Sequence, residues 1–552
     1  MAPAAKFKQG DLAQAAATYE EAAPRNWIKI GMSTCGVAAG ADPVFTAIRE
    51  EVEKRGVDIQ VMKTGCNGMC WAEPLVELNI EGLPRTMYRE VDADTARELV
   101  GKALDGKQVD ASRTAPGLCD IGFMEDGAPE DSVQKRVVLR NCGVIDPDDI
   151  EQYIARGGYQ ALERAIFELK SEGVIEELKK SGLRGRGGAG FPTWMKWSFC
   201  AKATGEEKFM LCNADEGDPG AYMDRSVLEG DPHAVIEGML LGCLAIGAET
   251  GFFYIRAEYP LAIDRIQNAI VQARKKGLLG KDILGSGWNC TLEVRLGAGA
   301  FVCGEETALL HSIEGKRGEP RPRPPFPAQK GLWEQPSNIN NVETLANIPP
   351  IIRNGGDWFA QWGTEKSKGT KVFALTGKVQ RSGLVEIPMG TTLRQIVEDI
   401  GGGVVEGRTF KAVQTGGPSG GVIPADYLDT PISYESLQEL GSIMGSGGMI
   451  VMDDLDSMVE IAKFYLGFTV EESCGKCAPC RIGGKQMLGL LEKIADGAGT
   501  TADIETLRRI ARAMQKASLC ALGQTAPNPV LSTLRYFGQE YDEKVQQPVA
   551  AS

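Results

Sequence analysis

Three cysteines in one short loop constrain this chain more than any other feature of its sequence. Cys474, Cys477 and Cys480 form a C-x-x-C-x-x-C motif, and a fourth cysteine, Cys520, follows forty residues later. Three thiolates at this spacing can each bind a different iron of a cubane, and the last corner then needs a ligand from elsewhere in the chain. Structural zinc sites more often use two C-x-x-C pairs. The motif predicts a [4Fe–4S] cluster, with zinc or unrelated thiols as the alternatives.

Length and composition point to a multidomain globular protein. The 552 residues exceed what a single hydrophobic core organises. Hydrophobic residues make up 43% of the chain and charged residues 24%, which is ordinary for soluble proteins. The net charge of −14 disfavours nucleic acid as the main ligand.

The cysteine content and the hydropathy pattern indicate the cellular compartment of the protein. Fourteen cysteines without a secretory signal favour thiols or metal ligands over a disulfide framework. Only two histidines are present, so sulfur is the expected metal ligand. No run of about 18 apolar residues occurs. We therefore expect a cytoplasmic protein without a transmembrane segment.

Hydrophobic periodicity and turn residues divide the chain into segments of α/β, mixed β and helical character. The first α/β segment is predicted to contain strands at 27–36, 57–62 and 75–80 and a helix at 45–55. Later strand-like runs alternate with helical runs, as in a larger α/β domain. The predicted segments are an N-terminal arm (1–25), a small α/β unit (26–110), a linker (111–145), a larger α/β domain (146–350), a β-grasp-like insert (365–437), a helical region (440–540) and a tail (541–552).

A glycine-rich run, RGRGGAGF at 184–191, matches G-x-G-x-x-G at Gly185, Gly187 and Gly190. The preceding residues are polar and helical, whereas a dinucleotide-binding Rossmann turn follows a buried strand. A plain flexible loop is the alternative. The residues that follow make the loop more specific, because glycines let a planar ring approach the backbone. The aromatic rings of Phe191 and Phe199 lie close in sequence to Lys196 and suit a flavin and a nicotinamide.

Polar side chains also gather after a predicted strand, in the sequence NADEGDPG. Asn213 and Asp215 come directly at the strand end, followed by Glu216 and Asp218. Open α/β sheets bind their ligands at the carboxyl ends of strands. We therefore expect this segment to contribute to a ligand site.

Two more segments place polar residues at predicted helix starts. Gly304, Glu305 and Glu306 open one helix, where a simple N-terminal cap is the alternative interpretation. The other segment can bond phosphate or ribityl hydroxyl groups near a helix start. Its candidates are Asn340, Asn341 and Thr344.

Taken together and in this order, the four segments and the cysteine motif closely resemble the NADH-binding flavoprotein subunit of respiratory complex I. Relatives of that subunit occur in soluble NAD-dependent formate dehydrogenases and NAD(P)-reducing hydrogenases. The resemblance covers roughly residues 135–540. It implies an α/β multidomain fold, with a Rossmann-like FMN and NADH domain at 146–350, a ubiquitin-like (SLBB-like) insert at 365–437 and a helical bundle at 440–540 that binds [4Fe–4S].

The resemblance also implies the roles of individual residues. The nicotinamide nucleotide is expected at Phe191, Phe199, Glu306, Arg323 and Phe326. The cluster is expected at Cys474, Cys477, Cys480 and Cys520. FMN is expected at Gly185, Gly187, Gly188, Lys196, Asn213, Asp215, Glu216, Asp218, Gly304, Glu305, Asn340, Asn341 and Thr344.

Two positions depart from the pattern usual in complex I. Asp218 stands where glutamate is common, and Arg323 stands where lysine is common. A shorter acid and a guanidinium can alter the tolerance for a 2′-phosphate, which keeps NADP open. Glu306 is retained, and a carboxylate beside the adenosine ribose repels that phosphate. NAD(H) is the expected nucleotide.

Residues 26–110 resemble the thioredoxin-like ferredoxin domain that binds [2Fe–2S] through four cysteines. Only Cys35, Cys66 and Cys70 match that pattern, because Gly40 replaces the second cysteine. A docking domain without a cluster and a cluster with a substitute ligand are the two alternatives. Cys119 and Cys142 are the nearest spare thiols.

The activity implied by the resemblance is that of an NAD(H):acceptor oxidoreductase, or diaphorase, subunit. NADH stacks against FMN between Phe191 and Phe199, and a hydride passes without a side-chain acid or base. Single electrons then cross the cluster to partner subunits, namely a thioredoxin-like [2Fe–2S] subunit and a catalytic subunit. An electron-bifurcating flavoprotein and an iron–sulfur scaffold without flavin are the alternatives. The bifurcating form often carries a further eight-cysteine extension, and no cysteine follows Cys520 here.

Overall fold

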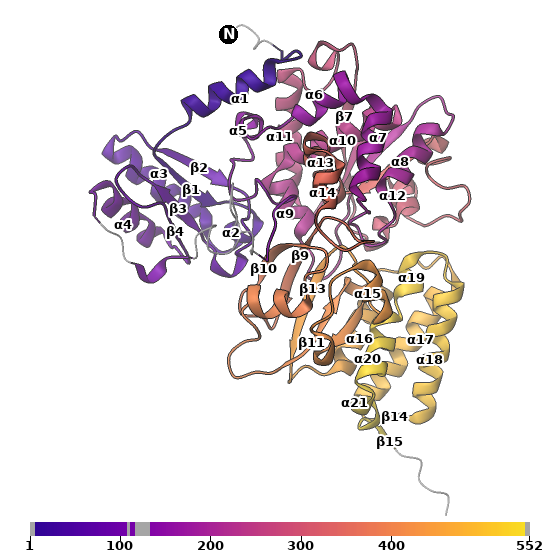
Figure 1. Ribbon diagram of the computed structural model, residues 1–552. Helices are drawn as coiled ribbons and strands as arrows, with labels where there is room; N and C mark the ends of the chain where they lie inside the picture. Colours follow the sequence, from indigo (N-terminus) through magenta and orange to yellow (C-terminus); the bar gives the residue numbers. More distant parts are fainter. Residues whose placement is uncertain (1–5, 108–110, 116–132, 547–552) are drawn as a thin grey trace, which may run out of the picture.

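The structure, a computed structural model, describes residues 6–107, 111–115 and 133–546. The predictions for the first residues of the arm, for about half of the linker including Cys119, and for the end of the tail lie outside these residues. Figure 1 shows an N-terminal unit, a larger α/β unit, a mixed sheet below it and a helical bundle. The α/β class predicted from the sequence is confirmed, since several mixed sheets and many helices make up the fold.

The N-terminal unit is a four-stranded sheet with helices, where three strands and one helix were predicted, and its strands lie in the order β2-β1-β3-β4. β1 pairs in parallel with β2 and antiparallel with β3. β1 is shorter than predicted, because the chain turns into helix α2 at Thr34. The last strand and the last helix of the unit were not predicted. Its elements are β1 (Trp27–Gly31), α2 (Thr34–Ala38), α3 (Ala41–Arg55), β2 (Gln60–Thr64), β3 (Val76–Asn79), β4 (Thr86–Tyr88) and α4 (Ala93–Leu104).

The N-terminal arm forms helix α1 (Asp11–Ala22), and it packs on the larger α/β unit rather than on the N-terminal unit. Leu12 is fully buried in the core of the α/β unit. The Phe7 amide donates to the carbonyl of Lys276 over 2.8 Å. The arm thus ties the start of the chain to the α/β unit.

The larger α/β unit contains a parallel sheet in the order β7-β6-β5-β8. Its first three strands were predicted. The fourth was not, because SNINN is polar and lacks the hydrophobic run typical of a buried parallel strand. The strands are β5 (Phe209–Ala214), β6 (Thr250–Arg256), β7 (Thr291–Gly297) and β8 (Ser337–Asn341).

Helix α10 (Pro232–Ile246) forms the centre of this unit. It is apolar on all sides and almost every residue is buried, as expected of a helix inside a large core. The Asp231 side chain accepts from the Ala234 amide at its N-terminus, and Gly247 ends it with a φ of 76°. The unit's other main helices are α5 (Ile150–Ala155), α6 (Gln160–Arg164), α7 (Lys170–Ser181), α8 (Thr193–Lys202), α9 (Met223–Gly230), α11 (Pro260–Lys276), α12 (Glu306–Ile313), α13 (Val342–Asn354) and α14 (Gly356–Ala360).

The insert forms a five-stranded sheet in the order β10-β9-β13-β11-β12. Its last strand, β13, lies inside the region predicted to be helical, and it pairs in parallel with β9. GMIVMD is a short apolar run, and most of its side chains are buried. The strand lies between β9 and β11, so the sheet continues beyond residue 437. The strands are β9 (Thr370–Gly377), β10 (Gly383–Pro388), β11 (Phe410–Thr415), β12 (Gly421–Pro424) and β13 (Gly448–Asp453), with helix α15 (Tyr434–Glu439) between the last two.

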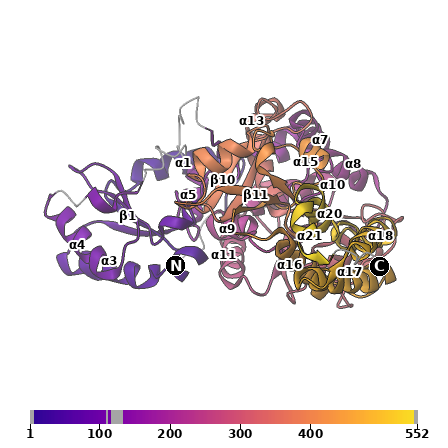
Figure 2. The same ribbon diagram turned by 90° about the horizontal axis from the view of Figure 1, so that it is seen from below.

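The C-terminal region consists of helices packed around a core of their own. In both views it lies at the opposite end of the molecule from the N-terminal unit (Figures 1 and 2). No helix in the described ranges is long and apolar enough to cross a membrane. The helices are α16 (Met458–Glu471), α17 (Ala478–Ala495), α18 (Thr501–Ala517), α19 (Ala521–Thr525), α20 (Asn528–Tyr536) and α21 (Gly538–Asp542).

Candidate functional site

Four thiols line one cavity, here called the cysteine cavity, of about 280 Å³ between α17, α19 and the α/β unit. Cys477 is the N-cap residue of α17, and Cys520 is the N-cap residue of α19. Cys474 lies in the preceding loop and Cys480 in the first turn of α17. Two helix N-termini therefore face the thiols, and their partial positive charge favours an anionic centre.

Positive side chains also surround this cavity. Arg317 donates to the carbonyl of Cys474 over 3.0 Å, and Lys476 donates to the carbonyl of Pro320 over 2.8 Å. Burial raises the pKa of Cys520 to about 11. A metal binds the deprotonated thiolate, whereas the apolar surroundings favour the protonated thiol. Metal binding in this cavity therefore releases protons from the cysteines. Four thiols on one cavity fit either a four-iron cluster or zinc.

The glycine loop, residues 184–191, follows helix α7, as predicted from the sequence. Gly188 has a φ of 126° and Gly190 a φ of 63°, conformations that favour glycine. A Cβ at Gly187 would lie 2.9 Å from Cβ of Asn341. The Gly185 amide donates to the carbonyl of Phe191 over 2.9 Å, which closes the loop.

Arg186, which the sequence did not single out, holds this loop in place. Its guanidinium is fully buried and donates to the carbonyls of Thr370 and Lys368 over 2.9 and 2.6 Å. Its amide donates to the Thr344 hydroxyl over 2.8 Å. The loop is therefore anchored to α13 on one side and to β9 on the other.

Asn213 and Asp215 lie together at the carboxyl end of β5. The Asn213 amide group donates to the carbonyl of Gly304 over 2.8 Å and accepts from the Asp215 amide over 3.1 Å. Oδ2 of Asp215 is buried and accepts no hydrogen bond from the described residues. Burial raises the pKa of Asp215 to about 7. An unpartnered buried oxygen at a strand end fits a ligand that brings its own hydrogen-bond donor.

Other predicted flavin residues are engaged with the protein itself. Glu216 accepts from the Asp224 and Arg225 amides at the start of α9, over 3.0 and 3.1 Å. Asn340 accepts from Nε1 of Trp197 over 2.8 Å. These contacts orient α9 and α8, so both side chains hold neighbouring helices in place around the site.

Asn341 and Asp218 also contact neighbouring elements. Asn341 donates to the Asp224 carboxylate over 2.6 Å and caps α13 by accepting from the Thr344 amide. Asp218 accepts from the Ser446 hydroxyl over 2.6 Å, in the segment before β13. Burial raises the pKa of Asp218 to about 6.

The two acids at the start of α12 have different surroundings. Glu305 accepts from the amides of Thr307 and Ala308, which is the helix cap considered from the sequence. Glu306 instead forms ion pairs with Lys196 over 3.2 Å and Arg323 over 2.7 Å. Burial raises the pKa of Glu306, but these two cations outweigh burial and leave the pKa below its usual value. Glu306 is thus an ionised acid near the protein surface.

Three aromatic side chains that the resemblance assigns to the nucleotide site are unusually exposed. Phe191 is 48% exposed, Phe199 53% and Phe326 52%. The Arg323 guanidinium lies 5.9 Å from the centre of the Phe326 ring. Exposed aromatic rings beside charged groups are typical of binding sites for flat, charged ligands.

One short segment connects this region to the cysteine cavity. Val302 and Cys303, in the turn before Gly304, pack in the same apolar cluster as Cys480 and Cys520. Val302 also lines the cavity itself. The candidate flavin segment and the cluster ligands therefore belong to one packed unit.

The three cysteines of the N-terminal unit also come together, and we call them the thiol triad. The sulfur atoms of Cys35, Cys66 and Cys70 all lie within 4.8 Å of one another. Hydrogen bonds from the other two thiols lower the pKa of Cys35. Gly40 lies between α2 and α3 with a φ of 103° and contributes no side chain.

The resemblance of the sequence implies FMN at the glycine loop, so a side chain at Gly187 is expected to weaken FMN binding. The Gly187→Ala methyl group displaces Asn341, and such overpacking costs roughly 1–3 kcal/mol. That corresponds to a roughly ten- to hundredfold loss of affinity, measured by titrating FMN into deflavinated protein. Gly489→Ala, where a Cβ meets no neighbour, is the matched control. Equal affinity in both variants would contradict the placement of FMN at this loop.

Comparison with known proteins agrees with this geometry. Residues 178–350 match the Nuo51 FMN-binding domain, and residues 460–544 match the iron–sulfur binding region of NADH-ubiquinone oxidoreductase-F. The NADP-reducing hydrogenase subunit HndC of Solidesulfovibrio fructosivorans is 57% identical over 412 residues, which are 75% of this chain and 84% of the relative. This chain belongs to the family of F-type subunits of NADH-quinone oxidoreductases.

Further members and a solved structure extend the comparison. The second F-type NADH-quinone oxidoreductase subunit of Rhizobium meliloti (strain 1021) is 46% identical over 74% of this chain and 98% of its own length. The crystal structure of an NAD⁺-reducing [NiFe]-hydrogenase in the H₂-reduced state superposes with a TM-score of 0.67 at 30% identity, covering 98% of this chain and 88% of that chain.

As a member of this family, the chain is an NADH-dependent oxidoreductase of a multi-subunit redox complex. Its cofactors are FMN in the α/β unit and a [4Fe–4S] cluster in the C-terminal region, with NAD(H) as the nucleotide. The predictions of family, activity and these cofactors are confirmed. The zinc alternative for the C-terminal cysteines is set aside, because the matched region is an iron–sulfur one.

Proposed function

We propose that this subunit exchanges a hydride between NAD(H) and FMN in the α/β unit and passes single electrons to partner subunits through the cysteine cavity. The observation that carries the proposal is the packing of Val302 and Cys303 against the cluster ligands, directly before Gly304 and Glu306. Bound FMN supplies the chemistry, because it accepts two electrons together and releases them one at a time.

The proposed flavin site is built around the glycine loop and the carboxyl end of β5. Gly187 and Gly188 let the ring approach the backbone, and Asp215 offers its unpartnered oxygen. Glu216, Asp218, Asn340 and Asn341 orient this region through the contacts described above. The full set is Gly185, Gly187, Gly188, Lys196, Asn213, Asp215, Glu216, Asp218, Gly304, Glu305, Asn340, Asn341 and Thr344.

The proposed nucleotide site uses the exposed aromatic rings and the ion pairs beside them. Phe191 and Phe199 flank the nicotinamide, and Phe326 and Arg323 contact the rest of the nucleotide. Glu306 accepts from the ribose hydroxyl groups and repels a 2′-phosphate. No side chain needs to donate or remove a proton during hydride transfer, so these residues act by orientation and charge.

Neutralising Glu306 is expected to narrow the preference for NADH over NADPH. In Glu306→Gln the carboxylate charge is lost while the side-chain size is kept, and Arg323 is released from its pair to meet a phosphate. We expect the KM for NADH to rise and that for NADPH to fall, each by roughly tenfold, which is about 1.4 kcal/mol. Steady-state dye reduction with both nucleotides measures this.

The control for that experiment is Glu314→Gln. Glu314 is the acid that follows α12, and its partners are Lys316, over 2.8 Å, and the Trp333 amide, over 3.0 Å, rather than Lys196 or Arg323. It should leave both KM values unchanged. A KM ratio that stays constant in Glu306→Gln would place the ribose elsewhere.

The remaining assignments extend this proposal. The N-terminal unit is a thioredoxin-like domain, the α/β unit is Rossmann-like, and the five-stranded sheet is a ubiquitin-like insert of SLBB type. The partners are a thioredoxin-like [2Fe–2S] subunit and a subunit that carries the second substrate, all in the cytoplasm. The relatives' names include both a quinone and a hydrogenase system, so the second substrate belongs to the partner.

Purification of the native complex tests the proposal directly. We expect one FMN and one [4Fe–4S] cluster per chain, NADH-dependent dye reduction and co-purifying iron–sulfur subunits. An intact preparation that lacks both FMN and dye reduction would refute the flavoprotein activity. A second reduced acceptor of much lower potential, formed from NADH in the same assay, would instead favour the bifurcating alternative.

A further inference from the structure

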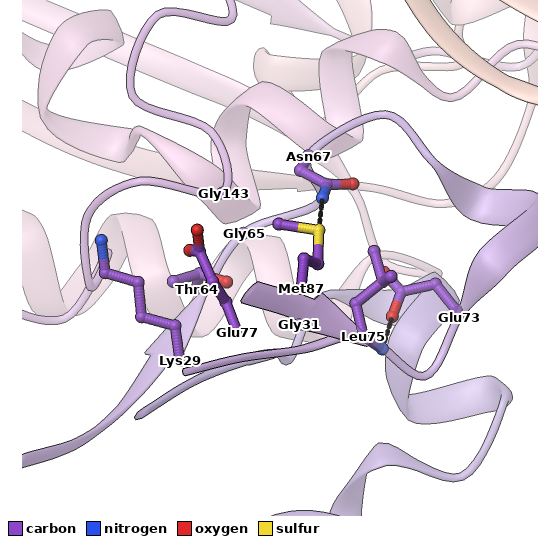
Figure 3. Close-up of a pocket in the computed structure, with 10 residues that line it drawn as sticks. All are labelled: Lys29, Gly31, Thr64, Gly65, Asn67, Glu73, Leu75, Glu77, Met87 and Gly143. Carbon is purple, nitrogen blue, oxygen red and sulfur yellow. Dashed lines mark hydrogen bonds between the residues drawn. The ribbon is translucent and has the colours of Figure 1, made fainter. Parts of the chain in front are cut away.

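The thiol triad has a fourth possible ligand, the carboxylate of Glu73. Oε1 of Glu73 lies 3.9 Å from the sulfur of Cys35, and the Glu73 side chain is only 9% exposed. Its other oxygen accepts from the Leu75 amide over 3.0 Å, which holds the carboxylate in place (Figure 3). A bound cation would stabilise such a buried carboxylate in its charged form.

Backbone encloses the Glu73 carboxylate closely. A Cβ at Gly31 would lie 2.9 Å from this carboxylate, and a Cβ at Gly36 would lie 3.2 Å from it. At Gly40, by contrast, a Cβ would meet no atom within 4 Å. The Glu73 carboxylate is thus held beside Cys35 by glycines that leave space for it.

The spacing of the sulfur atoms distinguishes one metal ion from a two-iron cluster. In a tetrahedral zinc site with Zn–S bonds of ~2.3 Å, two sulfur ligands stand ~3.8 Å apart, and a sulfur and a carboxylate oxygen ~3.6 Å. The sulfur atoms of Cys66 and Cys70 are 3.5 Å apart, and all three sulfurs lie within 4.8 Å. Thiolates on different irons of a [2Fe–2S] cluster stand farther apart, because two irons and their sulfides lie between them.

Further hydrogen bonds orient the sulfur atoms, as around known metal sites. The Gly68 amide donates to the Cys66 sulfur over 3.3 Å, and the Ser33 hydroxyl lies 3.1 Å from the Cys35 sulfur. Both sulfur atoms are thus oriented by groups of the N-terminal unit.

We propose that Cys35, Cys66 and Cys70 bind one zinc-class divalent ion, and that the Glu73 carboxylate, which lies 3.9 Å from the Cys35 sulfur but not within 4.8 Å of all three sulfurs, moves in as the fourth ligand. The site is structural and takes no part in electron transfer, since zinc has no redox chemistry. It is distinct from the FMN site and from the cysteine cavity, and the N-terminal unit lies at the opposite end of the molecule from the C-terminal bundle (Figures 1 and 2).

The residues next to the triad connect the N-terminal unit to both of its neighbours. Thr34, beside Cys35, donates to Glu229 of α9 over 2.9 Å, and the carbonyl of Gly68 accepts from the Leu384 amide of β10 over 3.0 Å. The Trp71 amide, next to Cys70, donates to the carbonyl of Ser382 over 3.1 Å. An ion at the triad fixes the two loops through which the N-terminal unit contacts both neighbouring units.

Metal analysis of the full-length holoprotein tests the proposal. Purified with zinc present and dialysed against a weak chelator, the wild type should retain one zinc per chain, and Cys66→Ser should retain none. Cys142→Ser, a fully buried thiol near but outside the triad, should retain it. FMN content and NADH-driven dye reduction, unchanged in all three proteins, verify that each is folded.

The variant Glu73→Gln tests whether Glu73 binds the metal or only supports the local structure. The amide oxygen can still accept from the Leu75 amide, but the negative charge is gone. We expect zinc affinity to fall by at least the roughly 10–100-fold that loss of a supporting residue causes. In cobalt-substituted protein, the tetrahedral cobalt bands should shift in Glu73→Gln and stay unchanged in Cys142→Ser.

Two outcomes would overturn the proposal. One is a wild-type protein that holds no zinc under these conditions and forms no tetrahedral thiolate–cobalt bands. The other is iron and sulfide beyond one [4Fe–4S] cluster, with a [2Fe–2S] EPR signal that disappears in Cys66→Ser. The second result would identify the triad as a cluster site with Glu73 as its substitute ligand.

Discussion

The variant Cys520→Ala is expected to lose the [4Fe–4S] cluster and with it electron delivery to the partner subunits. Cys520 comes from the start of α19, the other three proposed ligands belong to the loop and first turn of α17, and no further thiol of the described residues lines the cavity to replace it. NADH-driven reduction of the partner should fall at least as far as the roughly 100-fold that loss of a mere supporting residue can cause. Iron and sulfide content and EPR of the NADH-reduced protein measure the cluster.

Dye reduction should survive in the same variant, because a small dye collects electrons at the flavin. Cys200→Ala, which removes a buried thiol of α8, is the matched control and should keep both the cluster and partner reduction. Cys520→Ala protein with a full cluster and normal partner reduction would remove Cys520 from the ligand set. Loss of FMN together with iron would indicate instead that the fold had collapsed.

The largest expected effect on stability comes from Lys371→Met. Lys371, on β9, forms an ion pair with Glu343 of α13, and both side chains are almost completely buried. Its ammonium also donates to the carbonyls of Val372 and Ser446, over 2.7 and 2.6 Å. Removing one member leaves a buried charge without its partner, which costs about 3–5 kcal/mol. Urea-induced unfolding followed by tryptophan fluorescence measures the loss.

Two further variants make this prediction specific. Lys179→Met breaks a pair with Glu176 in which both side chains are 53% exposed, and it should change stability by less than ~1 kcal/mol. The double variant Lys371→Met/Glu343→Leu should recover most of the loss, because no charge remains buried. A single variant as stable as the Lys179→Met protein would show that Glu343 is neutral in the folded state, where burial already raises its pKa.

The sequence predicted the elements with strong local patterns and missed those that depend on tertiary contacts. The helix before the glycine loop was recognisable because VIEELKKSGL has helical periodicity, and it correctly excluded a Rossmann turn at Gly185. Strand β8 was missed because its polar SNINN sequence is stabilised by pairing with β5. Strand β13 was missed because its partners, β9 and β11, are distant in sequence.

The same reasoning applies to the sites. The C-x-x-C-x-x-C spacing was enough to predict the cluster, because three ligands share one loop. The roles of Arg186 and Lys371 were not predictable, since their partners lie on elements far along the chain. Glu73 gives no local signal either, because only the fold brings its carboxylate beside Cys35. The role of such a residue becomes recognisable only when the fold shows which distant partner it contacts.

The turn at Val302 and Cys303 has a consequence for engineering this protein. It precedes the flavin-side residues in sequence, yet it packs against the cysteines of the C-terminal bundle. Electron tunnelling between two centres falls off steeply with their separation, and here one covalent stretch sets that separation. The bundle is therefore not an exchangeable module. A chimera that replaces residues 458–542 with those of a relative must also carry that relative's version of the turn. Otherwise electron transfer between flavin and cluster is lost, even though both halves fold.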